Sequence, residues 1–401
     1  MTTQTKTTWR KVKLGEVTEI IDGDRGANYP QKDELLRSGY CVFLDAKNVS
    51  GTKFDFSSTQ FISERKHNLM RKGQLERGDF VLTTRGTVGN IAYYDSKIPH
   101  NCMRINSGMV IFRPRHDVIT DDFFYSFLIS REFRDQVEAL KTGSAQPQLP
   151  IRDLKLFEVE LPPISDQKRI AEILSTFDDK IELNNKISKT LEQMAQAIFK
   201  EWFVKSEKTK VKSEKLSNLG KIICGKTPSK SNSEYFGGNI PFIKIPDMHN
   251  QIFILKTEDS LTQAGANSQK TKFIHKNSIC VSCIATVGLV AITTEDSQTN
   301  QQINTIIPKS EIYLEFLYLA LKIIKSDLML IGSGGSTTLN INTNVFSNIE
   351  ILTPEESIIN KFHELVSPFF NKILQIYREN QKLAALRDLL LPKLMSGEIK
   401  V

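Results

Sequence analysis

Cysteine and histidine are the residues best suited to hold a metal ion or to act as nucleophiles, and here they are scattered. The six histidines are dispersed along 401 residues and form no pair at helical spacing. Cys280 and Cys283 make a CxxC pair, but it lies inside the apolar run 278–292 and has no second CxxC to match it. Such a pair is typical of small core residues on a strand. The sequence therefore predicts no metal site.

Motifs for catalysis are missing as well. The chain has no GxGxxG after a strand, no phosphate-binding GxxxxGK[ST] and no HExxH. It also lacks the Asn/Asp-Pro-Pro-aromatic string of an adenine methyltransferase. We therefore expect a chain that is not an enzyme and binds no cofactor itself. An enzyme of unrecognised type, for instance a hydrolase, is the alternative.

Polar side chains that can pair with base edges are plentiful in the predicted loops. Arg and Lys suit guanine, Asn and Gln suit adenine, and Ser and Thr suit either base. The candidates in the first half are Lys47, Asn48, Arg85, Thr87, Asn90, Arg104, Asn106, Gln146 and Gln148. Those in the second half are Lys244, Thr286, Asn300, Gln301, Gln302, Ser336, Thr337 and Asn340. Solvated turn chemistry is the competing interpretation for each, since Asn, Ser and Gly favour turns without any ligand.

These loops recur at matching places because the chain is a tandem repeat. The closest match pairs 78–94 with 277–293, two predicted hairpins that share Thr-Val-Gly at 87–89 and 286–288. Five looser matches keep the same order. They pair Leu14-Gly15 with Leu219-Gly220, 42–49 with 241–248, 105–114 with 299–308, the helical segments 121–130 with 314–323, and the small-polar loops 143–154 with 332–346.

A long helical stretch follows each repeat and carries a seam of residues at 3-4 spacing. The seam positions are Ile181, Asn184, Ser188, Leu191, Ala195, Ile198 and Trp202, then Ile373, Ile376, Asn380, Leu383, Arg387, Leu390 and Leu394. Such a seam predicts that the helices pair with each other, with the polar positions fixing register. Two amphipathic helices that pack separately on their own domains are the alternative. We interpret 178–179, Asp-Asp, as a solvated helix face.

The bulk properties exclude several classes of protein. A net charge of +7 fits a polyanionic partner but is a modest excess. The first residues, MTTQTKTTWRKVKLGEV, lack the apolar core of a signal peptide, and no uncharged apolar run comes near the roughly 18 residues that a membrane span needs. Five cysteines without a secretion signal predict reduced thiols. We therefore expect a cytoplasmic protein without a membrane partner.

The order of the parts and the local sequence motifs resemble those of the specificity subunits of Type I restriction-modification systems over nearly the whole chain. The resemblance rests on LPPISDQKRIAEILSTFDDKIELNNKISKTLEQMAQAIFKEWF, the Leu-Gly openings, the paired TVG turns and the closing LRDLLLPKLMSGEI. The second helical part opens with TPEESIINKFHEL, where the first has PPISDQKRIAEIL, the form more typical of the family. This difference leaves the start of the second helix open.

The resemblance implies an α+β fold: a tandem duplicate of a mixed α/β target-recognition domain plus a long helix, the helices pairing as an antiparallel coiled coil with pseudo-twofold symmetry. The predicted parts are a first target-recognition domain at 8–160, a first helical spacer at 161–204, a charged linker at 205–217, a second target-recognition domain at 218–352 and a second helical spacer at 353–401.

The same resemblance implies a subunit that recognises a split site in double-stranded DNA. It implies assembly with two methyltransferase subunits, and restriction subunits are a further possible partner. S-adenosylmethionine, ATP and Mg²⁺ are expected in those partners. A modification-only system and a coiled-coil interaction protein are the alternatives. Helix length would then set the half-site spacing, because about 25 residues of helix extend roughly 37 Å, close to one turn of DNA.

Overall fold

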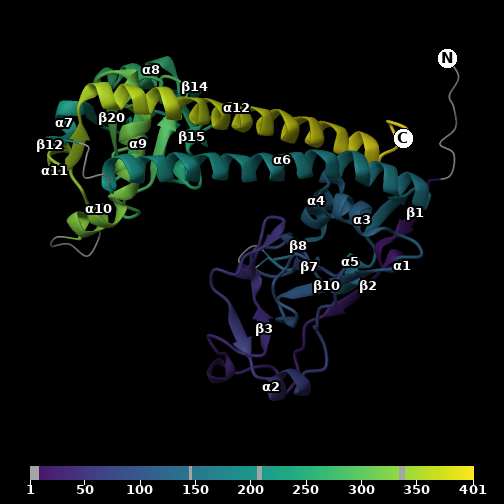
Figure 1. The fold of residues 1–401 in the computed structure, drawn as a ribbon. Coiled ribbons are helices and arrows are strands. Elements are labelled where there is room, and N and C mark those ends of the chain that lie inside the picture. Colours follow the sequence, from purple (N-terminus) through teal and green to yellow (C-terminus); the bar gives the residue numbers. More distant parts are fainter. Residues whose placement is uncertain (1–8, 144–146, 206–209, 334–338) are drawn as a thin grey trace, which may run out of the picture. The chain divides into compact units, whose positions relative to one another are not determined.

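The computed structural model describes residues 9–143, 147–205, 210–333 and 339–401. It divides into two compact units (Figure 1). The first unit consists of residues 1–180 and 383–401, and the second of residues 181–382. Two long helices, α6 (Ile164–Phe199) and α12 (Glu356–Met395), each contribute one segment to either unit.

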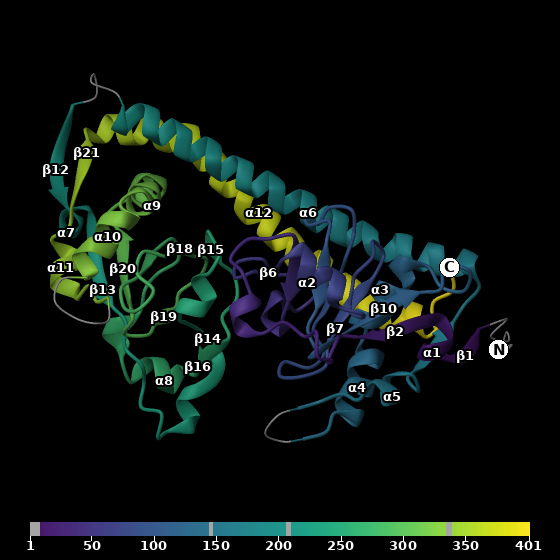
Figure 2. The same ribbon diagram turned by 90° about the horizontal axis from the view of Figure 1, so that it is seen from below.

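The first unit is built on two small sheets. The four-stranded sheet has the antiparallel order β2-β10-β7-β8, of which Figure 2 labels β2, β10 and β7. The three-stranded sheet has the order β6-β3-β9, with β3 and β9 parallel. Two further pairs are β1-β11 and β4-β5. The strands are β1 (Arg10–Lys13), β2 (Thr18–Asp22), β3 (Cys41–Leu44), β4 (Val49–Ser50), β5 (Lys53–Phe54), β6 (Gln60–Ile62), β7 (Phe80–Thr83), β8 (Ile91–Tyr93), β9 (Met103–Ile105), β10 (Met109–Pro114) and β11 (Glu158–Leu161). The short helices are α1 (Leu14–Val17), α2 (Glu64–Leu69), α3 (Asp121–Ile129), α4 (Arg131–Leu140) and α5 (Ile151–Leu154).

The four-stranded sheet is apolar on both faces, which explains why its strands are continuous apolar runs. On β7, Phe80 and Leu82 pack into a cluster with α3 and the ends of α6 and α12, whereas Val81 faces a second cluster that contains Val42 of β3. The sheet therefore lies between the helices on one side and the three-stranded sheet on the other.

The second unit repeats this topology. Its main sheet has the order β13-β20-β17-β18-β15, and its three-stranded sheet β16-β14-β19 again combines one antiparallel and one parallel pair. The strands are β12 (Val211–Lys215), β13 (Gly220–Cys224), β14 (Phe236–Ile243), β15 (Phe253–Ile254), β16 (Asp259–Leu261), β17 (Ile279–Ser282), β18 (Val290–Thr293), β19 (Gln298–Thr299), β20 (Ile303–Pro308) and β21 (Glu350–Pro354). The helices are α7 (Leu216–Leu219), α8 (Gln263–Asn267), α9 (Leu314–Ile323), α10 (Lys325–Gly332) and α11 (Thr343–Ser347). The predicted tandem duplicate of a mixed α/β domain is confirmed.

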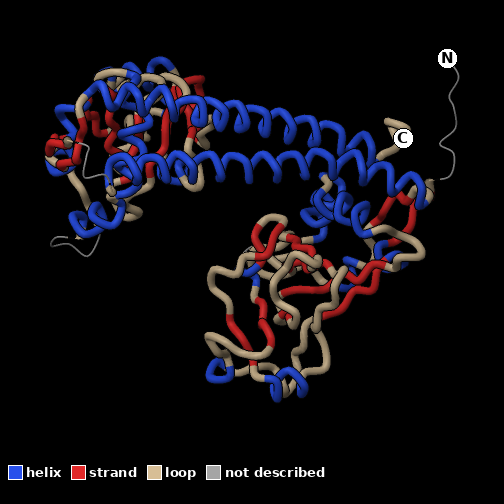
Figure 3. Tube along the Cα trace, in the orientation of Figure 1, coloured by secondary structure: helices blue, strands red, loops and turns tan. Residues whose placement is uncertain are grey.

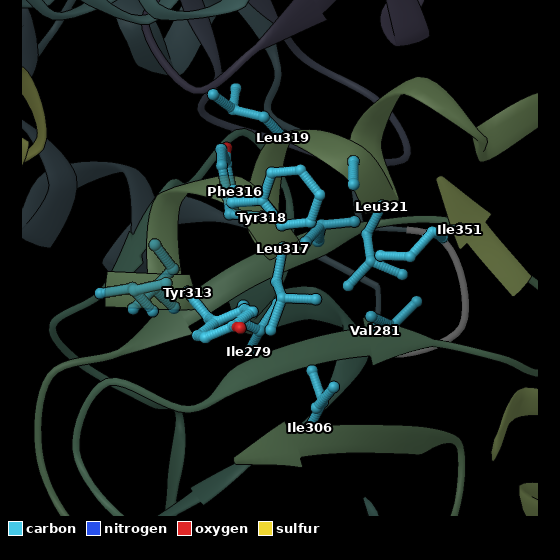
Figure 4. Close-up of a cluster of buried hydrophobic side chains, with 14 of the residues drawn as sticks. Ile279, Val281, Ile306, Tyr313, Phe316, Leu317, Tyr318, Leu319, Leu321 and Ile351 are labelled. Carbon is cyan, nitrogen blue, oxygen red and sulfur yellow. The ribbon is translucent and has the colours of Figure 1, made fainter. Parts of the chain in front are cut away.

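Helix α9 packs on the main sheet of the second unit and is apolar nearly all round. Leu317 and Tyr318 are buried among Ile279 of β17, Ile306 of β20 and other apolar side chains (Figure 4). Cys283 belongs to this cluster, while Cys280 faces a second cluster on the other side of the sheet. Both cysteines of the CxxC pair are therefore small core residues, as predicted.

Two predictions about the start of each repeat are wrong. Leu216, not Leu219, is the structural counterpart of Leu14, because the N–H of Leu14 donates to Phe157 and that of Leu216 donates to Ile349. The Leu-Gly pairs are thus three positions out of register. The charged stretch 205–217 is also not an open linker throughout, since β12 pairs with β21 from Val211 to Lys215.

The long helices pair antiparallel within each unit (Figure 3). In the second unit the side-chain amide of Asn184 donates to Asn380 at 2.8 Å and to Glu379 at 3.0 Å. In the first unit Arg387 pairs with Asp178 at 2.5 Å. The predicted antiparallel pairing is confirmed, and every predicted seam residue is buried or half-buried. Asp178 belongs to this pairing and is not merely a solvated residue.

Helix α6 continues into a π-helical turn at Lys200–Val204, and α12 begins at Glu356, which settles the start that the sequence left open. Within the described part of the chain, no helix combines the length and the apolar character needed to cross a membrane.

Candidate nucleic-acid interface

Three loops of the first unit meet beside its four-stranded sheet. They are 84–90 between β7 and β8, 106–108 between β9 and β10, and the described part of 141–150 between α4 and α5. The N–H of Thr84 donates to Gly108 at 2.8 Å, and the N–H of Leu149 donates to Thr84 at 3.0 Å. Arg85 forms a β-bridge with Gln148. We call these loops the first loop cluster.

The second unit has an equivalent second loop cluster, formed by 283–289, 300–302 and the described part of 333–342. The N–H of Cys283 donates to Gln302 at 2.8 Å, and the N–H of Ile341 donates to Cys283 at 2.8 Å. A β-bridge joins Ile284 to Asn340. The repeated polar loops predicted from the sequence therefore come together in the same way in both units.

Asn106 and Asn300 build the same turn in the two clusters. The side-chain oxygen of Asn106 accepts the N–H of Gly108 at 2.8 Å, and that of Asn300 accepts the N–H of Gln302 at 3.1 Å. This is a standard Asx turn. Both residues were predicted to contact bases, and in the structure their oxygens shape the loop that presents their neighbours.

Gly23 directly follows β2 and Gly225 directly follows β13, and both lie against this turn. A Cβ atom on Gly23 would lie 2.2 Å from the carbonyl oxygen of Asn106, and one on Gly225 would lie 2.1 Å from that of Asn300. Only glycine allows so close an approach. The segments 23–25 and 225–227 therefore belong to the loop clusters, although the sequence analysis did not single them out.

Six of the predicted base-contacting residues are exposed in the loop clusters. They are Arg85, Thr87 and Gln148 in the first cluster and Thr286, Gln301 and Asn340 in the second. The two clusters share one backbone arrangement and the threonine of the TVG turn, but they differ in the other side chains. They can therefore offer different patterns of donors and acceptors to a groove of DNA.

Asn48 and Arg104 do not lie where they could contact a base. Asn48 is 1% exposed, and its amide donates to the carbonyls of Asp55 and Ser58 at 2.9 and 3.1 Å. Arg104 is 4% exposed, and its guanidinium donates to backbone carbonyls that include Lys72 at 2.8 Å. Both were selected for side-chain type, but both fold inward and satisfy buried backbone groups.

The remaining described candidates are partly engaged within their own units. Asn90 donates to the carbonyl of Val49 at 3.0 Å, and Gln302 accepts from the side chain of Asn300 at 3.0 Å. Lys244 is ion-paired with Asp259, and the exposed Lys47 pairs with Asp45 at 3.3 Å. These contacts restrict the four side chains without excluding them from a surface. The candidates Gln146, Ser336 and Thr337 lie outside the described residues.

Three further residues lie at the loop clusters without having been predicted. Arg25 donates to the carbonyl of Ser107 at 3.4 Å, and the hydroxyl of Thr227 donates to Gln301 at 2.6 Å. The exposed Lys325 crosses the second TVG turn, because a Cβ on Gly288 would lie 2.7 Å from its Cγ. Arg25 and Thr227 could have been found from the sequence, because each closely follows a glycine that comes directly after a predicted strand. Lys325 carries no such signal.

Asp24 anchors the segment that follows β2 in the first unit. Its carboxylate accepts the N–H groups of Gly26 and Arg71, each at 2.9 Å. Burial raises the pKa of this carboxyl group, but backbone hydrogen bonds from Gly26, Arg71 and Arg25 outweigh burial and hold the pKa below its usual value. The ionised carboxylate of Asp24 therefore acts as a clamp: it holds the segment after β2, which belongs to the first loop cluster, against the backbone at Arg71.

Two other features of the first unit lie outside the loop cluster. An open cavity of about 720 Å³ is lined by Lys13, Arg131, Gln136, Glu158 and Met395, among other residues, and none of the predicted base-contacting side chains lines it. Cys41, His67 and Cys102 form the one group of potential metal ligands found among the described residues.

Comparison with known proteins gives one consistent result. The family model of the Type I restriction modification DNA specificity domain matches twice, at residues 6–193 and 208–385. The HindI specificity subunit of Haemophilus influenzae is 34% identical, with 98% of this chain and 99% of that protein covered. The MjaIX specificity subunit of Methanocaldococcus jannaschii is 27% identical, with 98% of this chain and 94% of that protein covered.

The fold agrees with these matches. The crystal structure of a Type I restriction-modification S subunit from M. genitalium superposes with a TM-score of 0.58 at 15% identity and covers 98% of both chains. The chain therefore belongs to the Type I restriction-modification DNA specificity family, with two copies of the family's domain.

Proposed function

We propose that the two loop clusters are the DNA-recognition surfaces of this specificity subunit, each selecting one half of a split target. The observation that carries the proposal is the equivalence of the clusters. The same hydrogen-bonded frame carries Arg85, Thr87 and Gln148 in one unit and Thr286, Gln301 and Asn340 in the other. A duplicated frame whose exposed side chains differ, apart from the shared threonine, suits two half-sites of different sequence.

In this proposal the chain contributes recognition and no catalysis. Two methyltransferase subunits, with restriction subunits where the system has them, supply the chemistry and bind S-adenosylmethionine, ATP and Mg²⁺. The paired helices join the recognition units and form part of the assembly surface. A protein that selects DNA sites works where the DNA is, so we place it in the cytoplasm.

The test is to co-express the chain with a methyltransferase subunit from the same restriction-modification system and to map methylated adenines in the host genome. We expect a split motif that appears only when the chain is present. Arg85→Ala should relax one position in one half of this motif, and Gln301→Ala one position in the other half. Chain-independent methylation, or no complex with the methyltransferase, would favour the interaction-protein alternative.

The same variants separate recognition from assembly. Both side chains are exposed, so neither substitution should prevent the chain from purifying with the methyltransferase. If either variant lost the complex altogether, that residue would belong to the assembly surface and the assignment of its loop cluster would be wrong. Lys230→Ala, another exposed residue of the second unit, serves as a matched control that should leave the motif unchanged.

A further inference from the structure

Cys41, His67 and Cys102 converge inside the first unit although they are far apart in the sequence. Cys41 opens β3, Cys102 directly precedes the parallel neighbour β9, and His67 lies on α2. Their two sulphurs and one ring nitrogen all lie within 4.8 Å of one another. Cys41 and His67 are buried, and Cys102 is half-buried.

We propose that this group is a binding site for one thiophilic metal ion, Zn²⁺ being the ion that fits best. Two thiolates and an imidazole are common zinc ligands. A tetrahedral site with the usual Zn–S and Zn–N bond lengths places sulphur and nitrogen about 3.6 Å apart. Sγ of Cys102 and Nδ1 of His67 are 3.5 Å apart. A water molecule would take the fourth position, reached from the side of the half-buried Cys102.

The buried Arg104 is compatible with a metal ion at this place. Zn²⁺ with two thiolates and a neutral imidazole carries no net charge, so the guanidinium would face a neutral complex. Arg104 Nε now donates to His67 Nδ1 at 3.0 Å, and this hydrogen bond would break when the ion takes the lone pair of Nδ1. Its bonds to the carbonyls of Lys72, His67 and Met70, at 2.8, 3.0 and 3.2 Å, would stay.

The second unit builds the same corner without the ligands. Arg104 pairs with Phe43 across the parallel strands, as Gln298 pairs with Phe242, so Ile240 and Asp296 stand where Cys41 and Cys102 stand in the first unit. The side chain of Gln298 donates to the carbonyl of Ala266 at 2.9 Å, as Arg104 donates to that of His67. Ala266 thus takes the place of His67.

This comparison within one chain shows that the corner does not require two cysteines and a histidine for its fold. If the two cysteines and the histidine only packed this corner, their presence in one copy and their absence from the other would have no explanation. The proposed ion would fasten α2 to the β3-β9 pair of the first unit alone.

The test uses the reduced full-length chain after removal of metal with a chelator. Titration with Co²⁺ should give one equivalent of bound ion, with the thiolate charge-transfer band and intense visible bands of tetrahedral cobalt, and Zn²⁺ should displace it. Cys102→Ser and His67→Ala should each weaken cobalt binding by at least about 100-fold, because loss of a group that only supports a metal ligand already costs up to about that much. Alanine is chosen because the second unit carries it there.

Cys224→Ser and Cys283→Ala are the matched controls and should leave cobalt binding unchanged. The proposal is overturned if the unaltered chain gives no tetrahedral cobalt spectrum, if the signal depends on Cys283, or if Cys41 and Cys102 are found as a disulfide. Should the ligand variants fail to fold, X-ray absorption of the zinc-loaded unaltered chain still decides. Two sulphur neighbours and one histidine nitrogen are expected, and a shell of oxygen alone would refute the site.

Discussion

Arg85 and Asn48 have side chains of equally suitable chemistry for a base, and only their surroundings separate them. Arg85 is exposed in the first loop cluster, whereas all three hydrogen bonds of the Asn48 side chain go to its own backbone surroundings. We expect Arg85→Ala to reduce discrimination at one base pair by about 1–3 kcal/mol without changing stability. Asn48→Ala should leave the recognised sequence unchanged and lower the free energy of unfolding by about 1–3 kcal/mol.

Duplex binding and urea unfolding of both variants check this pair of predictions. The assignment of the two residues would be reversed if Asn48→Ala altered the recognised sequence at unchanged stability.

Asp24 gives the first unit a dependence on pH with a definite sign. Because the folded state lowers the pKa of this carboxyl group, its contribution is present above the unfolded pKa of about 3.9 and is lost as pH falls through the folded pKa. The unaltered chain should therefore exceed Asp24→Asn in stability at pH 7 by more than it does near pH 3. Urea unfolding at both values measures the difference, with Asp117→Asn, an exposed residue, as control. A difference that does not change with pH would contradict the clamp.

Among the elements, the turn that joins β19 to β20 sets the shape of the second loop cluster. A Cβ on Gly225 would lie 2.1 Å from the carbonyl oxygen of Asn300 and 2.2 Å from Oγ1 of Thr299, so either the turn or the strand must move. Gly225→Ala should cost about 1–3 kcal/mol and disturb only the half-site that the second unit selects. Methylation mapping checks this, with Gly23→Ala expected to affect the other half-site.

Gly15→Ala is the control for these substitutions, because the nearest atom to its added Cβ would be Cβ of Lys155 at 3.3 Å, whereas a Cβ on Gly225 would meet its nearest atom at 2.1 Å. Equal loss of both half-sites from Gly225→Ala would mean that the two clusters do not act separately.

The helix pair depends on a polar contact at its seam. Asn184 is 1% exposed and donates to both Glu379 and Asn380. Asn184→Ala leaves those acceptors without this donor, so we expect a loss of about 1–3 kcal/mol in chemical denaturation. Combining it with Asn380→Ala should cost less than the two single losses added together, since the residues share one contact. Strict additivity would refute this, and Asn371→Ala on the exposed face of α12 is the control.

Element patterns were predictable from the sequence wherever the signal was repeated. The TVG turns, the long helices and their seam were found because each occurs twice with the same spacing. The start of each repeat was missed because Leu-Gly is a short match, and the backbone contacts that align Leu14 with Leu216 come from residues more than a hundred positions away.

The candidate site was predictable in its loops but not in each side chain. Asn48 folds inward onto the backbone of Asp45, Asp55 and Ser58, which its residue type does not reveal. Whether Arg104 points outward depends on the β3-β9 pairing, which joins segments about sixty residues apart and leaves no local pattern. The Cys41–His67–Cys102 group was missed for the same reason. Strand β12 was missed because its charged residues pair at the edge of the unit and need no apolar pattern.

At the scale of the whole molecule, the first unit is discontinuous and the second is continuous. The first unit takes Leu391, Leu394 and Met395 of α12 into its core. Burying each contributes about 1.5–3 kcal/mol, which together approaches the whole stability of a typical domain. A chain that ends after Lys382 should therefore lose hydrogen-exchange protection throughout the first unit and retain it in β17, β18 and β20 of the second. Retained protection in β7 and β10 would contradict this division.

The same discontinuity affects the order of folding on the ribosome. Domains usually fold in the order of their synthesis. Here residues 181–382 can close their core as soon as they leave the exit tunnel, while residues 1–180 must wait for 383–401 to be translated. The half of the chain that is made second is therefore the first to finish folding. Until then the apolar strands of the earlier half lack their last covering helix, and that interval is when a chaperone would be needed.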